Sequence, residues 1–164
     1  MNYTDLIANF ATRTLANLDL AKQTHDAGDP RAFEVTQLWN SLLALIVAPR
    51  ERDLTRLPET PLEQLHAEGW PDITTAGKLE SENLRGLVST LRHAVAHFNM
   101  EFHANGDGEI QEVSLWNART GYAPAGRPHR WDGRLTVDEL ERLARMIART
   151  YIDNLGARPA SGTL

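Results

Sequence analysis

The sequence predicts a mainly α-helical protein: a bundle of four long helices and one short helix, with a small β-hairpin inserted before the last helix. Two observations predict this fold class. Apolar residues recur every three or four positions in four separate stretches, which is the spacing of an amphipathic helix. Between the last two stretches the period falls to two, and Asn105–Gly108, which reads Asn-Gly-Asp-Gly, is a strong hairpin-turn signal.

The first two long helices are expected over about Tyr3–His25 and Arg31–Val47. Gly28-Asp29-Pro30 separates them, and Pro49 ends the second. The second stretch is the most apolar in the chain, so we expect it to be the central helix. The residues expected on the buried stripe of the first helix are Leu6, Ile7, Phe10, Thr14, Leu18 and Ala21.

A short third helix is expected to begin at Thr60. Threonine at the N-cap, Pro61 at the first helical position and Glu63 closing a capping box are typical of a helix start. Gly69-Trp70-Pro71 then stops it, and we expect Trp70 to cover an edge of the bundle.

The fourth helix is expected to start between Thr75 and Ser81 and to end near His97. Two strands follow, over Asn99–Ala104 and Glu109–Asn117, where apolar and polar residues alternate. Ile110 is out of phase with the apolar residues after it, so a β-bulge is expected there.

A loop is expected over Ala118–Gly133, before the last helix. That helix opens with a capping box of Thr136 and Glu139, and Gly156 is expected to cap its end. The residues that it is expected to bury are Leu140, Leu143, Ala144, Ile147 and Tyr151.

The length of 164 residues fits one helical domain over residues 1–157, with residues 158–164 as a flexible tail. The chain has no cysteine, no apolar run of about 20 residues and no leader-like start, which favours the cytoplasm and argues against a membrane partner. The net charge is −5. Residues 1–84 hold 7 basic and 13 acidic side chains, and residues 85–164 hold 10 and 9, so an anionic partner is expected to approach the second half.

The strongest candidate for chemistry is the end of the fourth helix, where Arg92, His93 and His97 lie within six residues. Arginine offers a planar fork of donors to a phosphate, and histidine exchanges a proton near neutral pH. On a regular helix Arg92 and His97 are about 140° apart around the axis. Either the arginine stem bends across, or the helix frays near His97, or two copies of the motif meet in a dimer.

Arg92 and His97 form the motif R-x-x-x-x-H, with the polar His93 directly after the arginine. This motif, near the end of a late helix, resembles the signature of the HEPN superfamily (higher eukaryotes and prokaryotes nucleotide-binding domains). Many HEPN proteins are small helical-bundle ribonucleases that need no metal. The neighbouring helices also fit, and the chain is most similar to bacterial HEPN proteins with a short β-segment after the motif.

The resemblance implies a homodimer in which two motifs form one composite cleft that cuts single-stranded RNA. His97 would be the general acid and base, and Arg92 would bind the scissile phosphate. His93 and Asn99 would support them, and neither a metal nor another cofactor is required. The implied role is a toxin or phage-defence effector, with an antitoxin or other regulatory protein as a candidate partner.

Three other interpretations of the same residues stay open. Arg92 and His97 would form ordinary interhelical pairs with carboxylates in a purely structural role. His93 and His97 have the i, i+4 spacing of helical metal ligands, and Glu101 and His103 follow a few residues later. The chain would also fit a HEPN domain that binds a nucleotide or a protein without cutting RNA.

The loop after the second strand is rich in arginine and aromatic residues. Aromatic rings stack on bases and arginines bind phosphates, as in proteins that bind single strands. Alternatively, Trp116 and Trp131 simply cover the apolar face of the hairpin. The candidate RNA-binding residues of this loop are Arg119, Tyr122, Arg127, Arg130 and Trp131.

Overall fold

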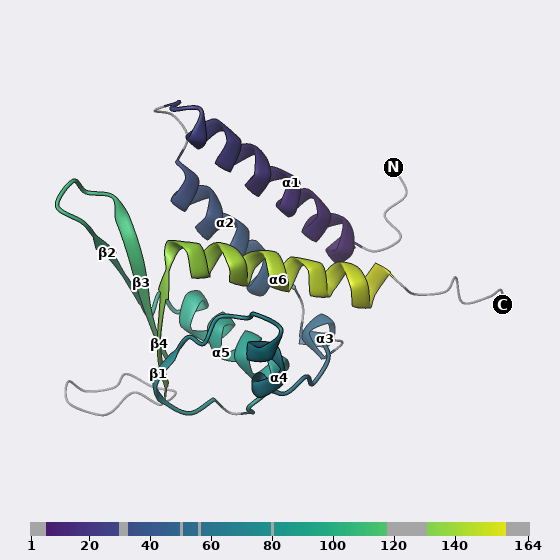
Figure 1. Cartoon of the computed structure of the whole chain (residues 1–164). Helices are drawn as coiled ribbons and strands as arrows, with labels where there is room; N and C mark the ends of the chain where they lie inside the picture. The colour runs from purple at the N-terminus through teal and green to yellow at the C-terminus, as the bar shows by residue number, and fades with distance from the viewer. Residues whose placement is uncertain are drawn as a thin grey trace.

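The computed structural model describes residues 6–29, 33–49, 51–55, 57–79, 81–117 and 131–156. Its helices pack side by side, and a sheet stands at one end of them (Figure 1). None of the helices in these segments is long and apolar enough to cross a bilayer. The elements are, in order, α1 (Leu6–Asp26), α2 (Glu34–Ile46), α3 (Glu51–Leu54), α4 (Leu62–Ala67), β1 (Thr74–Gly77), α5 (Leu84–Ala96), β2 (Met100–Ala104), β3 (Ile110–Asn117), β4 (Trp131–Thr136) and α6 (Val137–Gly156).

The expected helical bundle with an inserted hairpin is wrong, because the hairpin belongs to a four-stranded antiparallel sheet with the order β1-β4-β3-β2. β4 pairs on one side with β3 and on the other with β1, which precedes α5 in the chain. The sequence pattern does not reveal β1 because it is short and three of its four residues are exposed. In β4, a glycine occupies the position between Trp131 and Leu135 where an alternating strand would show an apolar side chain.

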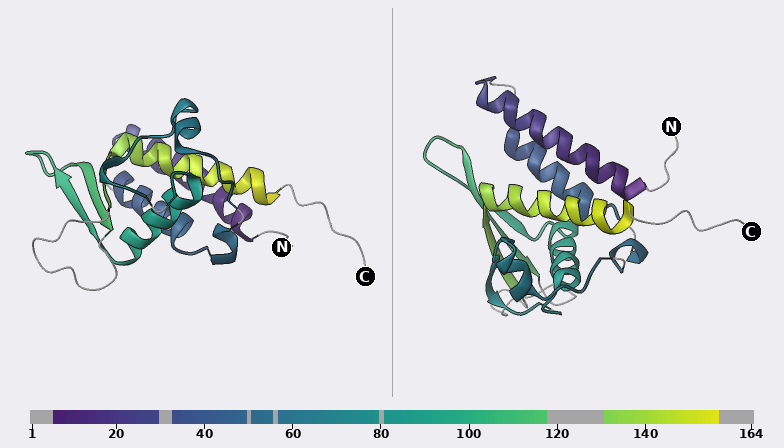
Figure 2. Two further views of the ribbon diagram at one scale, coloured as in Figure 1. Left: turned by 90° about the horizontal axis from the view of Figure 1, so that it is seen from below. Right: turned by 45° about the vertical axis from the view of Figure 1, so that its right-hand side comes forward.

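The hairpin of β2 and β3 lies where it was expected. His103 is opposite Glu112, whereas Ala104 is opposite Ile110, so Gln111 is the extra residue of a bulge. The expected bulge is therefore confirmed. The hairpin extends beyond the helices at one end of the molecule, and the start of α1 and the end of α6 lie close together at the other (Figure 2).

α6 is a central element of the core and packs against α1, α2 and the sheet. Its start is the expected capping box: the Thr136 N–H donates to Glu139 Oε2 at 2.9 Å, and the Glu139 N–H donates to Thr136 Oγ1 at 3.3 Å. The five side chains that were expected to be buried in this helix are at most 1% exposed.

Two details of the other helices differ from the expected ones. Thr60 is not the N-cap of α4, which is Pro61, because the Pro61 carbonyl accepts the first helical hydrogen bond, of 3.1 Å, from the Leu65 N–H. The Thr60 carbonyl accepts one of 2.9 Å from the Leu84 N–H. In α1, Leu6 is 68% and Phe10 40% exposed, although both were expected to be buried. Thr14 and Leu18 are buried as expected, and the rest of the buried face is formed by Ala8 and Ala11, whose small side chains let a neighbouring helix approach closely.

α5 begins at Leu84, later than expected, because β1 takes up part of the preceding segment. The side chain of its N-cap, Asn83, accepts a hydrogen bond of 2.9 Å from the Gly86 N–H. α5 contacts α2, α3 and β3, so most of its surface is enclosed. The buried residues of α5 are Leu84, Gly86, Leu87, Val88, Thr90, Leu91, Ala94 and Val95.

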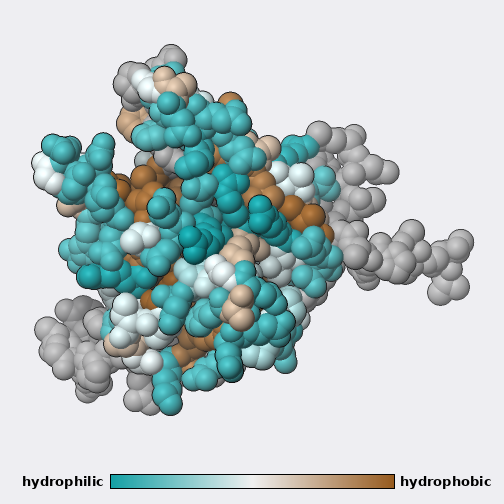
Figure 3. Space-filling view, viewed as in Figure 1, coloured by the Kyte–Doolittle hydropathy of each residue, from teal (hydrophilic) through white to brown (hydrophobic). Residues whose placement is uncertain are grey.

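Most of the face of the molecule seen in Figure 3 is hydrophilic, and its apolar surface is limited to strips between elements.

Candidate functional site

The motif spans the C-terminal end of α5. Arg92 and His93 lie in the last turns, Ala96 is the last helical residue, and His97 is the C-cap. The next residue, Phe98, has a positive φ of 54°. The helix therefore ends abruptly at His97, so the histidine stands at the rim of the helix.

The hydrogen bonds at this helix end are those of a Schellman motif. The Phe98 N–H donates to the Val95 carbonyl at 3.1 Å, and the Asn99 N–H donates to the Ala94 carbonyl at 2.9 Å. The Asn99 carbonyl in turn accepts a hydrogen bond of 3.1 Å from the Trp116 N–H of β3. The backbone next to His97 is thus fixed to both the helix and the sheet.

Arg92 is half-buried and lies on the inner side of α5. Its positive charge acts on the fully buried Tyr151 of α6, as does the negative charge of Asp53 of α3. Burial, the largest cause, raises the pKa of the Tyr151 phenol; the charge of Arg92 lowers it in part, and that of Asp53 raises it. The arginine therefore belongs to the junction of α5, α6 and α3.

His97 lies on the outside. Its side chain is exposed, whereas that of His93 is half-buried. The two ring centroids are 4.5 Å apart with 52° between the planes, and the His97 N–H donates to the His93 carbonyl at 3.2 Å. His97 and His93 thus form an imidazole pair, while the half-buried Arg92 acts electrostatically on Tyr151 of the same subunit.

Tyr151 supports a prediction about alkaline pH. Its hydroxyl is buried and has no hydrogen-bond partner among the described residues. An unfolded tyrosine ionises near pH 10, whereas the folded state keeps this phenol neutral to higher pH. The neutral phenol therefore contributes to the free energy of unfolding. This contribution is fully present below pH 10 and is lost as the pH rises toward the raised pKa of the folded state.

We therefore expect Tyr151→Phe to become more stable relative to wild type above pH 10, by up to about 1.4 kcal/mol for each pH unit. Urea unfolding of both proteins at pH 9, 10 and 11 measures this difference. Unfolding free energies that fall in parallel with pH would contradict the assignment.

The metal interpretation requires a third ligand beside His93 and His97. Glu101 is exposed on β2, and His103 Nε2 is 2.8 Å from Ser114 Oγ on the neighbouring strand. Within the described segments, no group of three or more histidine, aspartate or glutamate side chains is placed to hold a metal ion.

The arginine–aromatic loop lies mostly outside the described residues, as do its candidates Arg119, Tyr122, Arg127 and Arg130. Trp131 is described, and the expectation that it contacts RNA is wrong. Its side chain is 1% exposed, and its indole N–H donates to Thr74 Oγ1 at 3.0 Å. The ring is part of the core between β4 and β1.

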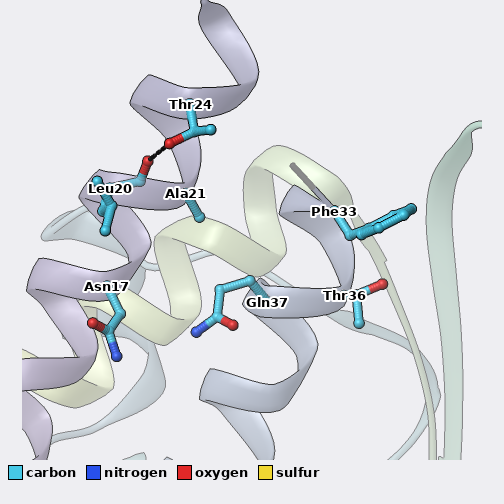
Figure 4. Close-up of a pocket in the computed structure, with 7 residues that line it drawn as sticks. All are labelled: Asn17, Leu20, Ala21, Thr24, Phe33, Thr36 and Gln37. Atoms are coloured by element: carbon cyan, nitrogen blue, oxygen red, sulfur yellow. Dashed lines mark hydrogen bonds between the residues drawn. The ribbon is translucent and has the colours of Figure 1, made fainter. Parts of the chain in front are cut away.

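A groove of about 500 Å³ lies between α1 and α2. Its residues include Asn17 and Gln37, and the Gln37 carboxamide points toward α1, whereas the Phe33 ring points away from α1 (Figure 4). The groove contains no residue of the R-x-x-x-x-H motif. It is therefore a second candidate site, separate in its residues from the motif.

Phe98 continues the apolar period of the motif helix after Leu91 and Val95, so the sequence predicts that it lies on the buried face, and this prediction is wrong. It is 76% exposed and directly follows His97. An aromatic residue next to the motif histidine is visible in the sequence, but its positive φ and exposure are visible only in the structure.

Comparison with known proteins agrees with the motif. A family model described as HEPN pEK499 p136 matches residues 1–157. No curated protein and no solved structure was found to match the chain.

Proposed function

The chain belongs to the HEPN pEK499 p136 family, and from this membership we propose that it is a metal-independent endoribonuclease that acts as a homodimer. The observation that carries the proposal is the placement of the motif. The match covers the whole described chain, and His97 stands exposed where the buried helix α5 ends. An imidazole at such a rim can reach a substrate, whereas one inside the bundle could not.

In the proposed reaction, the 2′-oxygen of a ribose attacks the adjacent phosphorus and the bond to the 5′-oxygen breaks. One His97 accepts the proton of the 2′-hydroxyl, and His97 of a second copy donates a proton to the leaving 5′-oxygen. Arg92 stabilises the negative charge that builds on the phosphate oxygens. The products are a 2′,3′-cyclic phosphate and a 5′-hydroxyl.

The dimer is needed because the proposed reaction uses two imidazoles at once, and one subunit supplies one exposed His97. Two copies that meet at the ends of their α5 helices bring two imidazoles to one cleft. His93, whose ring lies 4.5 Å from that of His97 with a tilt of 52°, orients that ring, and Asn99 lies where the backbone enters the sheet. These supporting roles for His93 and Asn99 are part of the proposal.

The proposal is tested by incubating the purified protein with single-stranded RNA in the presence of EDTA. We expect cleavage to continue, with 2′,3′-cyclic phosphate ends detected by mass spectrometry and a dimer detected by light scattering. Loss of cleavage in EDTA that added Mg²⁺ or Zn²⁺ restores would contradict a metal-independent mechanism. A strict monomer that still cuts RNA would contradict the composite cleft.

The same membership supports a biological proposal: a toxin or phage-defence effector in the cytoplasm, restrained by an antitoxin or other regulatory protein. Family membership and the absence of a membrane-spanning helix in the described segments are compatible with this role.

A second candidate function is a binding module that does not cut RNA. The groove between α1 and α2 favours it, because Asn17 and Gln37 offer amide donors and acceptors beside the apolar Leu20 and Ala21. Calorimetric binding of a nucleotide to a protein that leaves RNA intact would favour this function over the nuclease.

A further inference from the structure

We propose that Phe98 is a base-stacking residue of the RNA site, whose ring packs on a nucleobase next to the phosphate that His97 acts on. The inference rests on the proposed nuclease function and extends it. It concerns how the substrate is held, not how the bond is broken. Its basis is an exposed aromatic side chain at a backbone position that disfavours one.

The backbone of Phe98 is in the left-handed region, with a φ of 54°. This is the position after the C-cap, where a Schellman motif normally has glycine, or sometimes asparagine. A side chain with a Cβ is strained there, and a bulky aromatic one is a genuine outlier. Glycine would keep both hydrogen bonds of the motif, from Phe98 to Val95 and from Asn99 to Ala94, because both are backbone bonds.

Burial of the ring does not offset this strain, because Phe98 is 76% exposed, the highest value among the large apolar residues described. A strained residue that the core does not require points to a function of its side chain. The side chain offers one chemical property, a flat aromatic face. Nucleobases of single-stranded RNA are recognised by stacking on such faces.

The placement of the ring fits this role. Phe98 follows His97 directly and both side chains are exposed, so the proposal places the base of a nucleotide against the ring when its phosphate is at the imidazole. The backbone is fixed on both sides, since the Met100 N–H donates to the Phe98 carbonyl at 2.9 Å and Asn99 is bonded to β3. A fixed backbone and only two side-chain torsions keep the entropy lost on binding small.

Two other exposed aromatic residues are less suited to this role. Phe102 on β2 is 40% exposed, and its ring already packs edge-on against Trp39, with centroids 5.2 Å apart. Phe10 on α1 is also 40% exposed, but it lies outside both the motif and the groove between α1 and α2. Phe10 is therefore a control for the loss of an exposed aromatic ring.

The test measures RNA binding apart from cleavage, in protein inactivated by His97→Ala. We expect Phe98→Gly to weaken binding of a fluorescent single-stranded RNA by about five- to a hundredfold. The same change should raise Tm by about 2–4 °C, because it relieves the left-handed strain. Phe98→Trp should keep the affinity, Phe98→Leu should lose most of it without the gain in Tm, and Phe10→Ala should bind as the parent does.

A purely structural role for Phe98 would not combine higher stability with weaker binding. Unchanged RNA affinity in Phe98→Gly, beside normal cleavage by the wild type, would overturn this inference and leave the nuclease proposal standing. A Phe98→Gly protein that becomes monomeric in light scattering would also overturn it, since the ring would then be a contact between two copies. A wild-type protein that neither binds nor cuts RNA would overturn both proposals.

Discussion

Replacing His97 with alanine is expected to lower the rate of RNA cleavage by about a hundredfold to ten-thousandfold, the range that a positioned general acid or base contributes. The fold should be unaffected. His97 is exposed at the C-cap, and its hydrogen bond to the His93 carbonyl comes from the backbone. We therefore expect the free energy of unfolding to change by no more than about 0.5 kcal/mol. A fluorogenic RNA assay and a thermal melt of the same preparation measure both quantities.

His103→Ala is the matched control, because it also removes one imidazole, but from a histidine outside the motif whose ring is hydrogen-bonded to Ser114 on the sheet. It should cut RNA at the wild-type rate. Arg92→Lys is the complementary change, since it keeps the charge and most of the half-buried stem but loses the planar fork. Cleavage by His97→Ala at the wild-type rate, or an equal loss of cleavage rate in His103→Ala, would contradict the proposed role of His97.

Gly133→Ala is expected to lower the free energy of unfolding strongly, by about 2–3 kcal/mol. A Cβ at this position would lie 2.5 Å from Cζ2 of Trp131 and 2.9 Å from the Ile73 carbonyl oxygen. Neither neighbour can easily move. Trp131 is buried and bonded to Thr74, and the Ile73 carbonyl accepts a hydrogen bond of 2.9 Å from the Arg134 N–H.

Thermal unfolding should show this cost as a fall in Tm of about 4–12 °C. Gly106→Ala in the hairpin turn is the matched control, because a Cβ there meets no atom within 4 Å. It should stay within about 0.5 kcal/mol of wild type. An unchanged Tm in Gly133→Ala would mean that the packing of Trp131 on this glycine is not as tight as the structure has it.

The long helices of this chain could be predicted from sequence because each has a periodic apolar face, and the capping box at Thr136 marks the start of α6. The four-residue helix α3 could not, because its sequence is charged and too short to show a period. The sheet could not. β1 carries too few apolar residues to stand out, and in β4 the ring of Trp131 covers the position that Gly133 leaves empty. In α1, apolar residues occur on two faces, and the pattern alone does not tell that Ala11 is buried while Leu6 is exposed.

For the candidate site, the sequence identified the residues but not their directions. Helical geometry alone placed Arg92 and His97 about 140° apart. Only the packing of α5 against its neighbours decides that the arginine is half-buried and the histidine exposed. The left-handed turn at Phe98 could not be foreseen, because helix ends of this kind are normally recognised by a glycine.

The pairing of β1 with β4 affects how the protein can fold during its synthesis. Both long-range closures, β1 with β4 and α1 with α6, use elements made after Trp131, whereas the motif is made much earlier. Contacts between distant segments form late in folding. A chain still emerging from the ribosome, or one truncated before β4, therefore carries Arg92 and His97 without the scaffold that holds them, and the proposed site can form only once β4 and α6 have been made.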